Sequence, residues 1–177
     1  MLVLVVGPSG AGKDTLLTMA RTALADDARF RFVRRVITRP AESGDENHEP
    51  VSDTEFAARR FTLSWEAHGL RYGIPADIAD DLARGIVVVA NVSRSIIAEA
   101  ATRFPVRVVE VTAPAQVLEA RLSARRRETA ADIAQRLARR IPLPSGIELA
   151  TVVNDSSPEV GAAQLLAHLA RALRGRG

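Results

Sequence analysis

The feature that most constrains the fold of this chain is a glycine-rich loop placed between an apolar strand and a helix. Residues 2–6, LVLVV, are continuously apolar, which is typical of a strand buried on both faces of a parallel sheet. The sequence GPSGAGK follows at once at residues 7–13, and apolar residues then recur at helical spacing from Leu16 to Leu24. A strand, this loop and a helix form the context in which the spacing G-x-x-x-x-G-K binds phosphate. We therefore expect a parallel α/β sheet built around a phosphate site.

The composition of the loop suits a bound nucleotide. Its glycines allow the backbone to curl until several N–H groups point inward, and the following helix adds the positive end of its dipole. Lys13 is the only lysine in a chain whose other basic residues are all arginine. A compact ammonium at this position reaches the terminal phosphates of a nucleotide. We therefore predict that ATP binds at the following residues: Gly7, Pro8, Ser9, Gly10, Ala11, Gly12, Lys13, Asp14 and Thr15.

Asp14 departs from the usual pattern, which has Ser or Thr at this position as a ligand of Mg²⁺. A carboxylate beside a triphosphate is repelled unless a cation lies between them, and carboxylate oxygens are ordinary Mg²⁺ ligands. Asp14 is therefore interpreted as binding Mg²⁺ directly or through water, with Thr15 supplying a nearby hydroxyl. The alternative is that Asp14 only stabilises the N-terminus of the helix.

The rest of the pattern predicts further strands and helices of the same sheet. Apolar runs at 86–90, 106–111 and 151–153 indicate strands, and Pro114 and Pro158 open helices after the last two. Such alternation favours a parallel sheet with right-handed crossovers. The segment between is expected to contain a weak strand at 31–37, a loop at 39–50, a helix from Ser52 to Arg60, strands at 61–65 and 70–74, and a helix from Pro75 to about Arg84.

The bulk composition limits the kind of protein. The chain has 177 residues, the size of one ordinary domain, with 47% hydrophobic and 25% charged residues. It contains no cysteine, which excludes disulfides, thiolate metal ligands and a cysteine nucleophile. The apolar run at 2–6 is far too short for a signal peptide or a membrane span. A cytoplasmic protein without a membrane partner is expected, as a monomer or a homodimer.

Two residues outside the loop are candidate ligands for the phosphate of an acceptor. Arg39 lies in Thr38-Arg39-Pro40 at the end of a predicted strand, and Tyr72 lies at the end of the predicted hairpin. An arginine fork and a tyrosine hydroxyl are both suited to holding a phosphate. Each has a simpler interpretation as well, since a core position for Tyr72 and a surface position for Arg39 also fit the pattern.

A third cluster is rich in arginine and lies near residues 125–140. Arg125, Arg127 and Arg136 are interleaved with alanines at helical spacing. Such a face is usually solvated, and it is also compatible with nucleic-acid binding. With one Trp and one Tyr, however, the chain has few aromatic residues for base stacking, so no nucleic-acid partner is expected. In a chain with a phosphate loop we favour a lid whose arginines neutralise charge during phosphoryl transfer.

Together these residues resemble the guanylate-kinase-like P-loop kinases. GPSGAGK, TRP, the hairpin end Tyr72-Gly73-x-Pro75, the arginine-rich segment and Val153-Asn154-Asp155 occur in that family's order over essentially the whole chain. The resemblance implies an α/β P-loop kinase fold in a single domain. It further implies a core of residues 1–30, 81–124 and 141–177, an acceptor-binding insertion at about 31–80, and a lid at about 125–140.

The departures from guanylate kinases indicate one branch of this family. Leu63 stands where those kinases read guanine with a glutamate nine residues before the hairpin tyrosine. RRVI at 34–37 lacks their serine, and VANVSR at 89–94 replaces their acidic D-x-D pattern. The guanine reader is therefore expected to be absent, and the chain is similar to the ribose 1,5-bisphosphate phosphokinases. The shared motifs are GPSGxGKD, ENH at 46–48, SW at 64–65 and N-x-S-R at 91–94.

This resemblance implies transfer of the γ-phosphoryl of ATP to the 1-phosphate of ribose 1,5-bisphosphate, with a product, 5-phosphoribosyl 1-diphosphate, that links the reaction to phosphonate metabolism. The implied site residues are Lys13, Asp14, Arg125, Arg127 and Arg136 for catalysis; Arg39, His48, Tyr72, Asn91, Ser93 and Arg94 for the acceptor; and Asn154 and Asp155 near the adenine. Two alternatives stay open. One is a nucleoside monophosphate kinase that acts on GMP, and the other is a non-catalytic guanylate-kinase-like binding module, which the intact loop disfavours.

Overall fold

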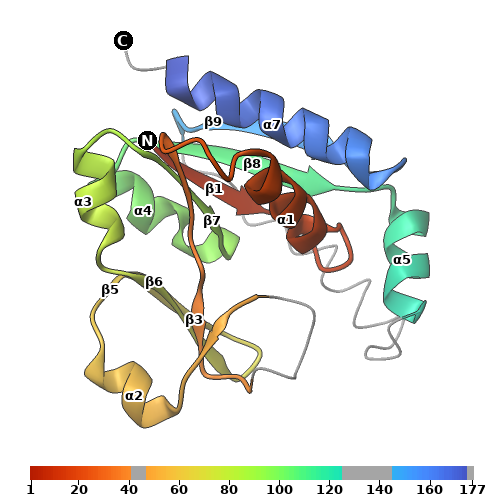
Figure 1. The fold of residues 1–177 in the computed structure, drawn as a ribbon. Coiled ribbons are helices and arrows are strands. Elements are labelled where there is room, and N and C mark those ends of the chain that lie inside the picture. The colour runs from red at the N-terminus through yellow and green to blue at the C-terminus, as the bar shows by residue number, and fades with distance from the viewer. Residues whose placement is uncertain (41–46, 125–144, 175–177) are drawn as a thin grey trace.

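The centre of the fold is a five-stranded parallel sheet, seen in a computed structural model that describes residues 1–40, 47–124 and 145–174 (Figure 1). The strand order is β2-β7-β1-β8-β9, and every neighbouring pair is parallel. The strands are β1 (Leu2–Val6), β2 (Phe30–Phe32), β7 (Val87–Asn91), β8 (Val106–Thr112) and β9 (Glu148–Val153). The central strand β1 is buried along its whole length, as its continuous apolar pattern predicts. The expected parallel α/β arrangement is confirmed.

Helices cover both faces of this sheet. They are α1 (Lys13–Ala23), α3 (Ile78–Ala83), the 3₁₀ helix η1 (Arg94–Ile96), α4 (Ile97–Arg103), α5 (Ala115–Ala124) and α7 (Pro158–Arg174). Helices α1 and α7 pack against each other over one face, and α3 and α4 lie over the other (Figure 1). Within the described ranges, no helix is both long enough and apolar enough to cross a membrane.

A second, smaller sheet is inserted between β2 and α3. Its order is β4-β3-β6-β5, with strands β3 (Val36–Ile37), β4 (Glu49–Pro50), β5 (Phe61–Ala67) and β6 (Leu70–Pro75), and it carries the short helix α2 (Asp53–Ala58). Strands β5 and β6 form a hairpin whose two turn residues, His68 and Gly69, both have positive φ. Helix α2 begins with a capping box between Ser52 and Glu55. This sheet lies within the segment expected to bind the acceptor.

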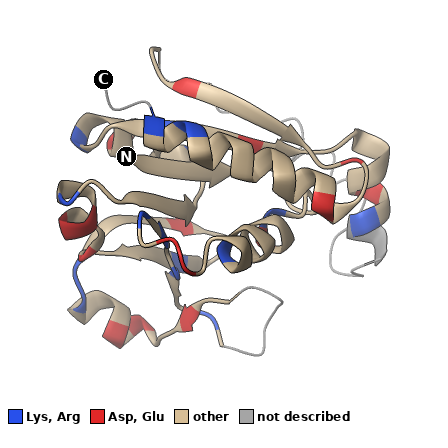
Figure 2. Ribbon diagram, turned by 45° about the horizontal axis from the view of Figure 1, so that its top comes forward, with Lys and Arg blue, Asp and Glu red and all other residues tan. Residues whose placement is uncertain are grey.

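Ion pairs join α3 and the residue before it, which follow the insertion, to β2 of the main sheet, and Figure 2 shows cations and carboxylates lying next to one another in several places. Asp81 of α3 is buried and accepts hydrogen bonds from Arg31 of β2 and from Arg84. Arg31 also donates to Asp77, at 2.8 Å. Burial alone would raise the pKa of Asp81, but the bonds from Arg31 and Arg84 outweigh burial and hold that pKa below its usual value. The junction between α3 and β2 is therefore a charged contact.

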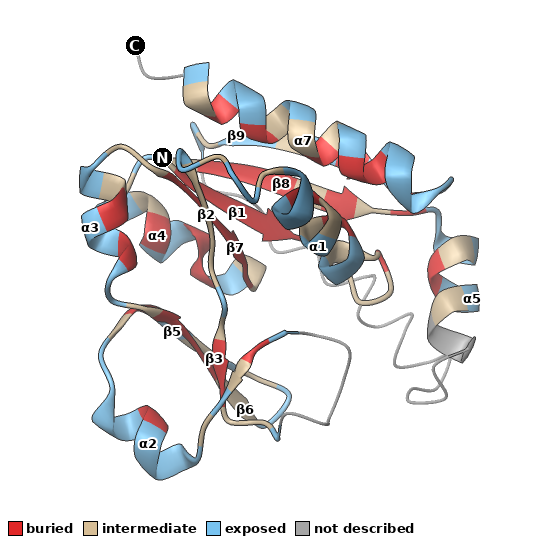
Figure 3. Ribbon diagram, viewed as in Figure 1, coloured by how far each residue is buried: buried red, intermediate tan, exposed pale blue. Residues whose placement is uncertain are grey.

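The hydrophobic core lies on both faces of the main sheet (Figure 3). Successive side chains of β1 alternate, so that Val3 and Val5 belong to the cluster under α1 and α7 while Leu4 belongs to the cluster under α4. Leu63 of β5 and Ile74 of β6 are part of this second cluster. The inserted sheet and the main sheet therefore share one hydrophobic core.

The insertion differs from the sequence expectation in detail. The predicted strand at 31–37 is two strands in different sheets, β2 and β3, because residues 33–35 carry the chain from one sheet to the other. The predicted loop at 39–50 ends in β4, which pairs in parallel with β3. Pro75 closes β6 by pairing with Phe61, so that α3 begins only at Ile78. All of these pairings join residues that are distant in the sequence, so they cannot be predicted from local propensity.

Candidate active site

The loop at residues 7–12 connects β1 to α1 and is shaped by its glycines. Gly7 has φ 145°, and a Cβ there would lie 2.0 Å from the carbonyl oxygen of Val111. Gly12 has φ 86°, and a Cβ there would lie 2.4 Å from Nδ2 of Asn154. Helix α1 begins immediately after this loop. Leu16 N–H donates to the Gly12 carbonyl, and the N–H groups that come before Leu16 in the helix have no partner within it. The loop therefore presents backbone donors and a helix N-terminus to an anion.

Lys13 lies over the same loop. Its ammonium donates to the carbonyl oxygens of Gly7 and Pro8, each at 2.9 Å. These contacts place the only lysine of the chain beside the converging N–H groups. The expected partners in phosphate binding are thus brought together by local structure.

Asn154, which directly follows β9, and Arg121 of α5 donate hydrogen bonds to carbonyl groups of the loop. Asn154 is buried, and its Nδ2 donates to the Ala11 carbonyl at 2.8 Å while its own N–H bonds to Thr112. Arg121 donates to the Gly10 carbonyl at 3.4 Å. Nδ2 of Asn154 is therefore engaged with the loop backbone. The expected place of Asn154 near the adenine remains a prediction, as does that of the exposed Asp155. Arg121 was missed by the sequence analysis, since a single arginine in a predicted helix carries no distinguishing signal.

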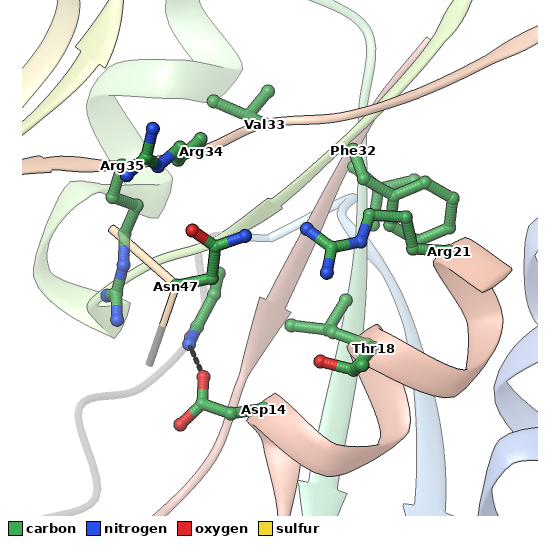
Figure 4. A pocket seen from close by; sticks show the side chains of 11 residues that line it. Asp14, Thr18, Arg21, Phe32, Val33, Arg34, Arg35 and Asn47 are labelled. Carbon is green, nitrogen blue, oxygen red and sulfur yellow. Dashed lines mark hydrogen bonds between the residues drawn. The ribbon is translucent and has the colours of Figure 1, made fainter. Parts of the chain in front are cut away.

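Asp14 and Asn91 face each other across the edge of the sheet. Nδ2 of Asn91 donates to Oδ1 of Asp14 at 2.9 Å (Figure 4). Asn91 ends β7, and its register partner is Val5 of β1, which leads into the loop. The sequence analysis assigned these two side chains to the metal and to the acceptor respectively. The structure joins them in one contact.

The donor set around Asp14 fits Mg²⁺. One carboxylate oxygen of Asp14 accepts from Asn91, which leaves the second for a cation or a water molecule. In the described parts of the chain, no three or more His, Cys, Asp or Glu side chains form a metal-binding group. Mg²⁺ bound to nucleotides is commonly held by one or two carboxylates together with phosphate oxygens and water, so a single carboxylate suffices.

A cavity of about 70 Å³ opens beside this contact. It has room for several water molecules and lies between α1, the segment at 32–35 and the end of β7 (Figure 4). Among the described residues that line it, three are arginines and one, Asp14, is a carboxylate. The lining residues are Asp14, Leu17, Thr18, Arg21, Phe32, Val33, Arg34, Arg35, Asn47, Val89 and Asn91. Of these, the sequence analysis had singled out only Asp14 and Asn91 as site residues.

Arg39, His48 and Tyr72 lie together in the inserted sheet. His48 is 3% exposed, with Nε2 at 3.0 Å from the Arg39 carbonyl oxygen and Nδ1 at 3.3 Å from the Arg39 guanidinium. Tyr72 is 8% exposed and stacks on Trp65 at 5.2 Å, with the guanidinium of Arg35 over the tyrosine ring. Buried His48 thus pairs with the partly exposed Arg39, and Tyr72 has the core environment that was its simpler interpretation. Contact of all three with an acceptor remains a prediction.

Ser93 and Arg94 are engaged in local contacts beyond β7. Ser93 caps η1 by accepting from the N–H of Ser95, and Arg94 forms an ion pair with Glu110 of β8. Their assignment to the acceptor remains a prediction. The three lid arginines, Arg125, Arg127 and Arg136, lie outside the described residues.

Comparison with known proteins gives the chain its family. No protein-family model matches it. The chain is 56% identical over 171 residues to the ribose 1,5-bisphosphate phosphokinase PhnN of Acidiphilium cryptum, covering 96% of this chain and 92% of that one. It is 49% identical to the enzyme of the same name from Methylobacterium radiotolerans, covering 95% and 96% of the two chains.

Among solved structures, the guanylate kinase of Anaplasma phagocytophilum superposes with a TM-score of 0.70 at 16% identity, covering 99% of this chain and 87% of that one. This likeness shows the guanylate-kinase-like P-loop fold. The relatives extend over nearly the whole chain, as the motifs predicted. The chain belongs to the ribose 1,5-bisphosphate phosphokinase family.

Proposed function

We propose that this chain transfers the γ-phosphoryl group of ATP to the 1-phosphate of ribose 1,5-bisphosphate, giving 5-phosphoribosyl 1-diphosphate and ADP. The observation that carries the proposal is the identity of 56% over nearly the whole length of a relative named ribose 1,5-bisphosphate phosphokinase. The glycine loop, Lys13 and Asp14, which the transfer requires, are all intact. The acceptor is a small sugar-phosphate, and no nucleic-acid partner is involved.

The reaction needs positioning more than proton transfer. An oxygen of the 1-phosphate forms a bond to the γ-phosphorus of ATP, while the bond from that phosphorus to the bridging oxygen breaks and its electron pair leaves with ADP. The attacking oxygen is already anionic near neutral pH, so no strong general base is required. Catalysis is then the alignment of two phosphates and the neutralisation of their charge.

The loop and Lys13 are assigned to the donor. The N–H groups at the start of α1 bind the phosphates of ATP, and the Lys13 ammonium moves its hydrogen bonds from the carbonyls of Gly7 and Pro8 to phosphate oxygens. The arginines of the 125–140 segment neutralise the transferring group. Asn154, by holding Ala11, keeps the loop in its curled form.

Asp14 is assigned to the metal side of the site. Bound Mg²⁺ supplies charge neutralisation on the phosphates, and Asp14 would hold it with Thr15 nearby. Asn91 fixes one oxygen of Asp14 and so orients the carboxylate. On the acceptor side, Arg39, His48 and Tyr72 are assigned to the phosphates of the sugar, together with the cavity beside Asp14.

The test is to incubate the purified protein with Mg²⁺ and ATP and with either ribose 1,5-bisphosphate or GMP, measuring ADP and the phosphorylated product. We expect 5-phosphoribosyl 1-diphosphate to form from the sugar and GMP to remain unchanged. Turnover of GMP alone would identify a divergent guanylate kinase. Absence of ATP binding would favour a non-catalytic binding module.

A further inference from the structure

We propose that Arg21 contacts the second phosphate of the acceptor, the one distant from the reaction, and so makes the enzyme select a sugar with two phosphates over a sugar with one. This inference rests on the proposed function. It adds a specificity-determining residue from the core helix α1 that neither the motifs nor the family resemblance had assigned.

The first support is the position of Arg21 on the helix. Asp14, Leu17, Thr18 and Arg21 all line the cavity, and their spacing places them on one face of α1. With a rise of 1.5 Å per residue, Asp14 and Arg21 are separated by about 10 Å along the helix axis. A pentose with a phosphate at each end is a ligand of comparable length. Asp14 is next to the ATP loop, so Arg21 is at the end of the cavity away from the reaction.

The second support is that the guanidinium of Arg21 has no competing partner among the described residues. The other two arginines of the cavity are engaged, because Arg34 donates to the His48 carbonyl at 2.7 Å and Arg35 lies over the ring of Tyr72 at 5.5 Å. Arg21 is exposed, and no hydrogen bond or ion pair with another described residue holds its guanidinium. Figure 4 shows it pointing from α1 across the cavity, toward the side on which Asn47 lies.

The third support is the charge of the cavity. Among the described lining residues, Arg21, Arg34 and Arg35 outnumber the one carboxylate, that of Asp14, which is itself hydrogen-bonded to Asn91. An excess of fixed cations is unfavourable in a site for a neutral sugar, and it suits an acceptor that brings a dianion in addition to the reacting phosphate. A guanidinium fork binds such a phosphate through two parallel hydrogen bonds.

The proposal is tested with two inhibitors, each of which carries only one of the two phosphates of the acceptor. We compare the wild-type enzyme, Arg21→Gln and Arg21→Lys, measuring kcat/KM for ribose 1,5-bisphosphate and the inhibition constants of ribose 5-phosphate and ribose 1-phosphate against it. Arg60→Gln is the matched control, because Arg60 is exposed and does not line the cavity. Thermal unfolding of each variant checks that the fold is retained.

For Arg21→Gln, we expect kcat/KM for the bisphosphate to fall, and the inhibition constant of ribose 5-phosphate to rise, by about tenfold to a hundredfold. Inhibition by ribose 1-phosphate should change by less than about twofold, Arg21→Lys should recover part of the loss, and Arg60→Gln should match the wild type. Equal weakening of both monophosphates, or of neither, overturns the role of Arg21 while leaving the proposed function intact. A wild-type enzyme that fails to phosphorylate the bisphosphate overturns both.

Discussion

The glycine loop at residues 7–13, which we propose binds ATP, and the cavity beside it are built in opposite ways. The loop follows a fully buried strand, and its path is fixed at its main-chain atoms, by the hydrogen bond from the Asn154 side chain to the Ala11 carbonyl and by the close approach of Gly7 to the Val111 carbonyl. The cavity is formed mainly by side chains, and Arg34, Arg35 and their neighbours come from the irregular segment between the two sheets.

Under the proposed function, this difference separates binding of the donor from choice of the acceptor. A loop that presents main-chain N–H groups recognises phosphates of any nucleotide, and few substitutions can change it without breaking it. A cavity lined by arginine side chains can be altered one residue at a time while the sheet stays unchanged. A shared fold with guanylate kinase at only 16% identity is compatible with a different acceptor for this reason.

The largest expected effect comes from Lys13, which tests the loop directly. Replacing it by methionine removes the only ammonium beside the phosphates, and we expect kcat to fall by about a thousandfold or more, the scale of losing one preorganised charged contact. Stability should change little, because the bonds to Gly7 and Pro8 are only partly buried. ADP release and thermal unfolding measure the two quantities. Activity within about tenfold of the wild type would contradict the assignment of Lys13 to the transferring phosphates.

The loop is also the part of the site that the sequence predicts best. Strand, glycines, lysine and helix are consecutive, so their arrangement follows from local geometry alone. The contact of Asp14 with Asn91 does not follow in this way, because the two are far apart in sequence and meet only if β7 lies beside β1. The ion pair of Arg94 with Glu110 depends in the same way on packing between distant elements.

Arg21 illustrates a different limit. Its spacing from Asp14 was visible in the sequence, but an arginine on a helix is usually solvated. Only the position of the segment at 32–35 opposite α1 turns this face into the wall of a cavity. The short strands β3 and β4 were likewise unpredictable, because two residues each carry too little pattern.

The next largest effect is expected at the junction between α3 and β2, away from both the loop and the cavity. Asp81→Asn removes the charge of a buried carboxylate that accepts from Arg31 and Arg84, and we expect the free energy of unfolding to fall by about 1–3 kcal/mol. Asp77→Asn is the matched control, since Asp77 binds the same Arg31 but its side chain is 60% exposed, against 6% for Asp81. The control should lose less than about 1 kcal/mol in urea unfolding.

The dependence of stability on pH in acid provides a second measure of this junction. Because the pKa of Asp81 is lowered on folding, its stabilisation is present above pH 3.8 and is lost as the pH falls below that value. The free energy of unfolding should therefore fall less steeply with acid in Asp81→Asn than in the wild type. Asp77→Asn should keep more of the wild-type dependence on pH. Equal effects of the two substitutions would show that the buried position of Asp81 is unimportant, and the junction would then be no more than a surface ion pair.

The smallest effect is expected at His168 of α7, on the core side of the molecule. Partial burial lowers the pKa of its imidazole, and the cationic Arg171 and Arg107 lower it further, outweighing a backbone hydrogen bond with Thr151 and the charge of Glu148. The unfolded chain therefore binds a proton at this residue more readily than the folded chain does. Stability contributed by neutral His168 is complete above pH 6.5 and is lost as the pH falls through the lowered pKa.

We expect the thermal midpoint of the wild type to fall between pH 7.5 and pH 5 by more than that of His168→Gln, which cannot titrate. Asp81 stays charged throughout this range because its pKa is held below 3.8, so the junction contributes nothing to the difference. Equal slopes for the two proteins, or a wild type that gains stability on acidification relative to His168→Gln, would contradict the lowered pKa.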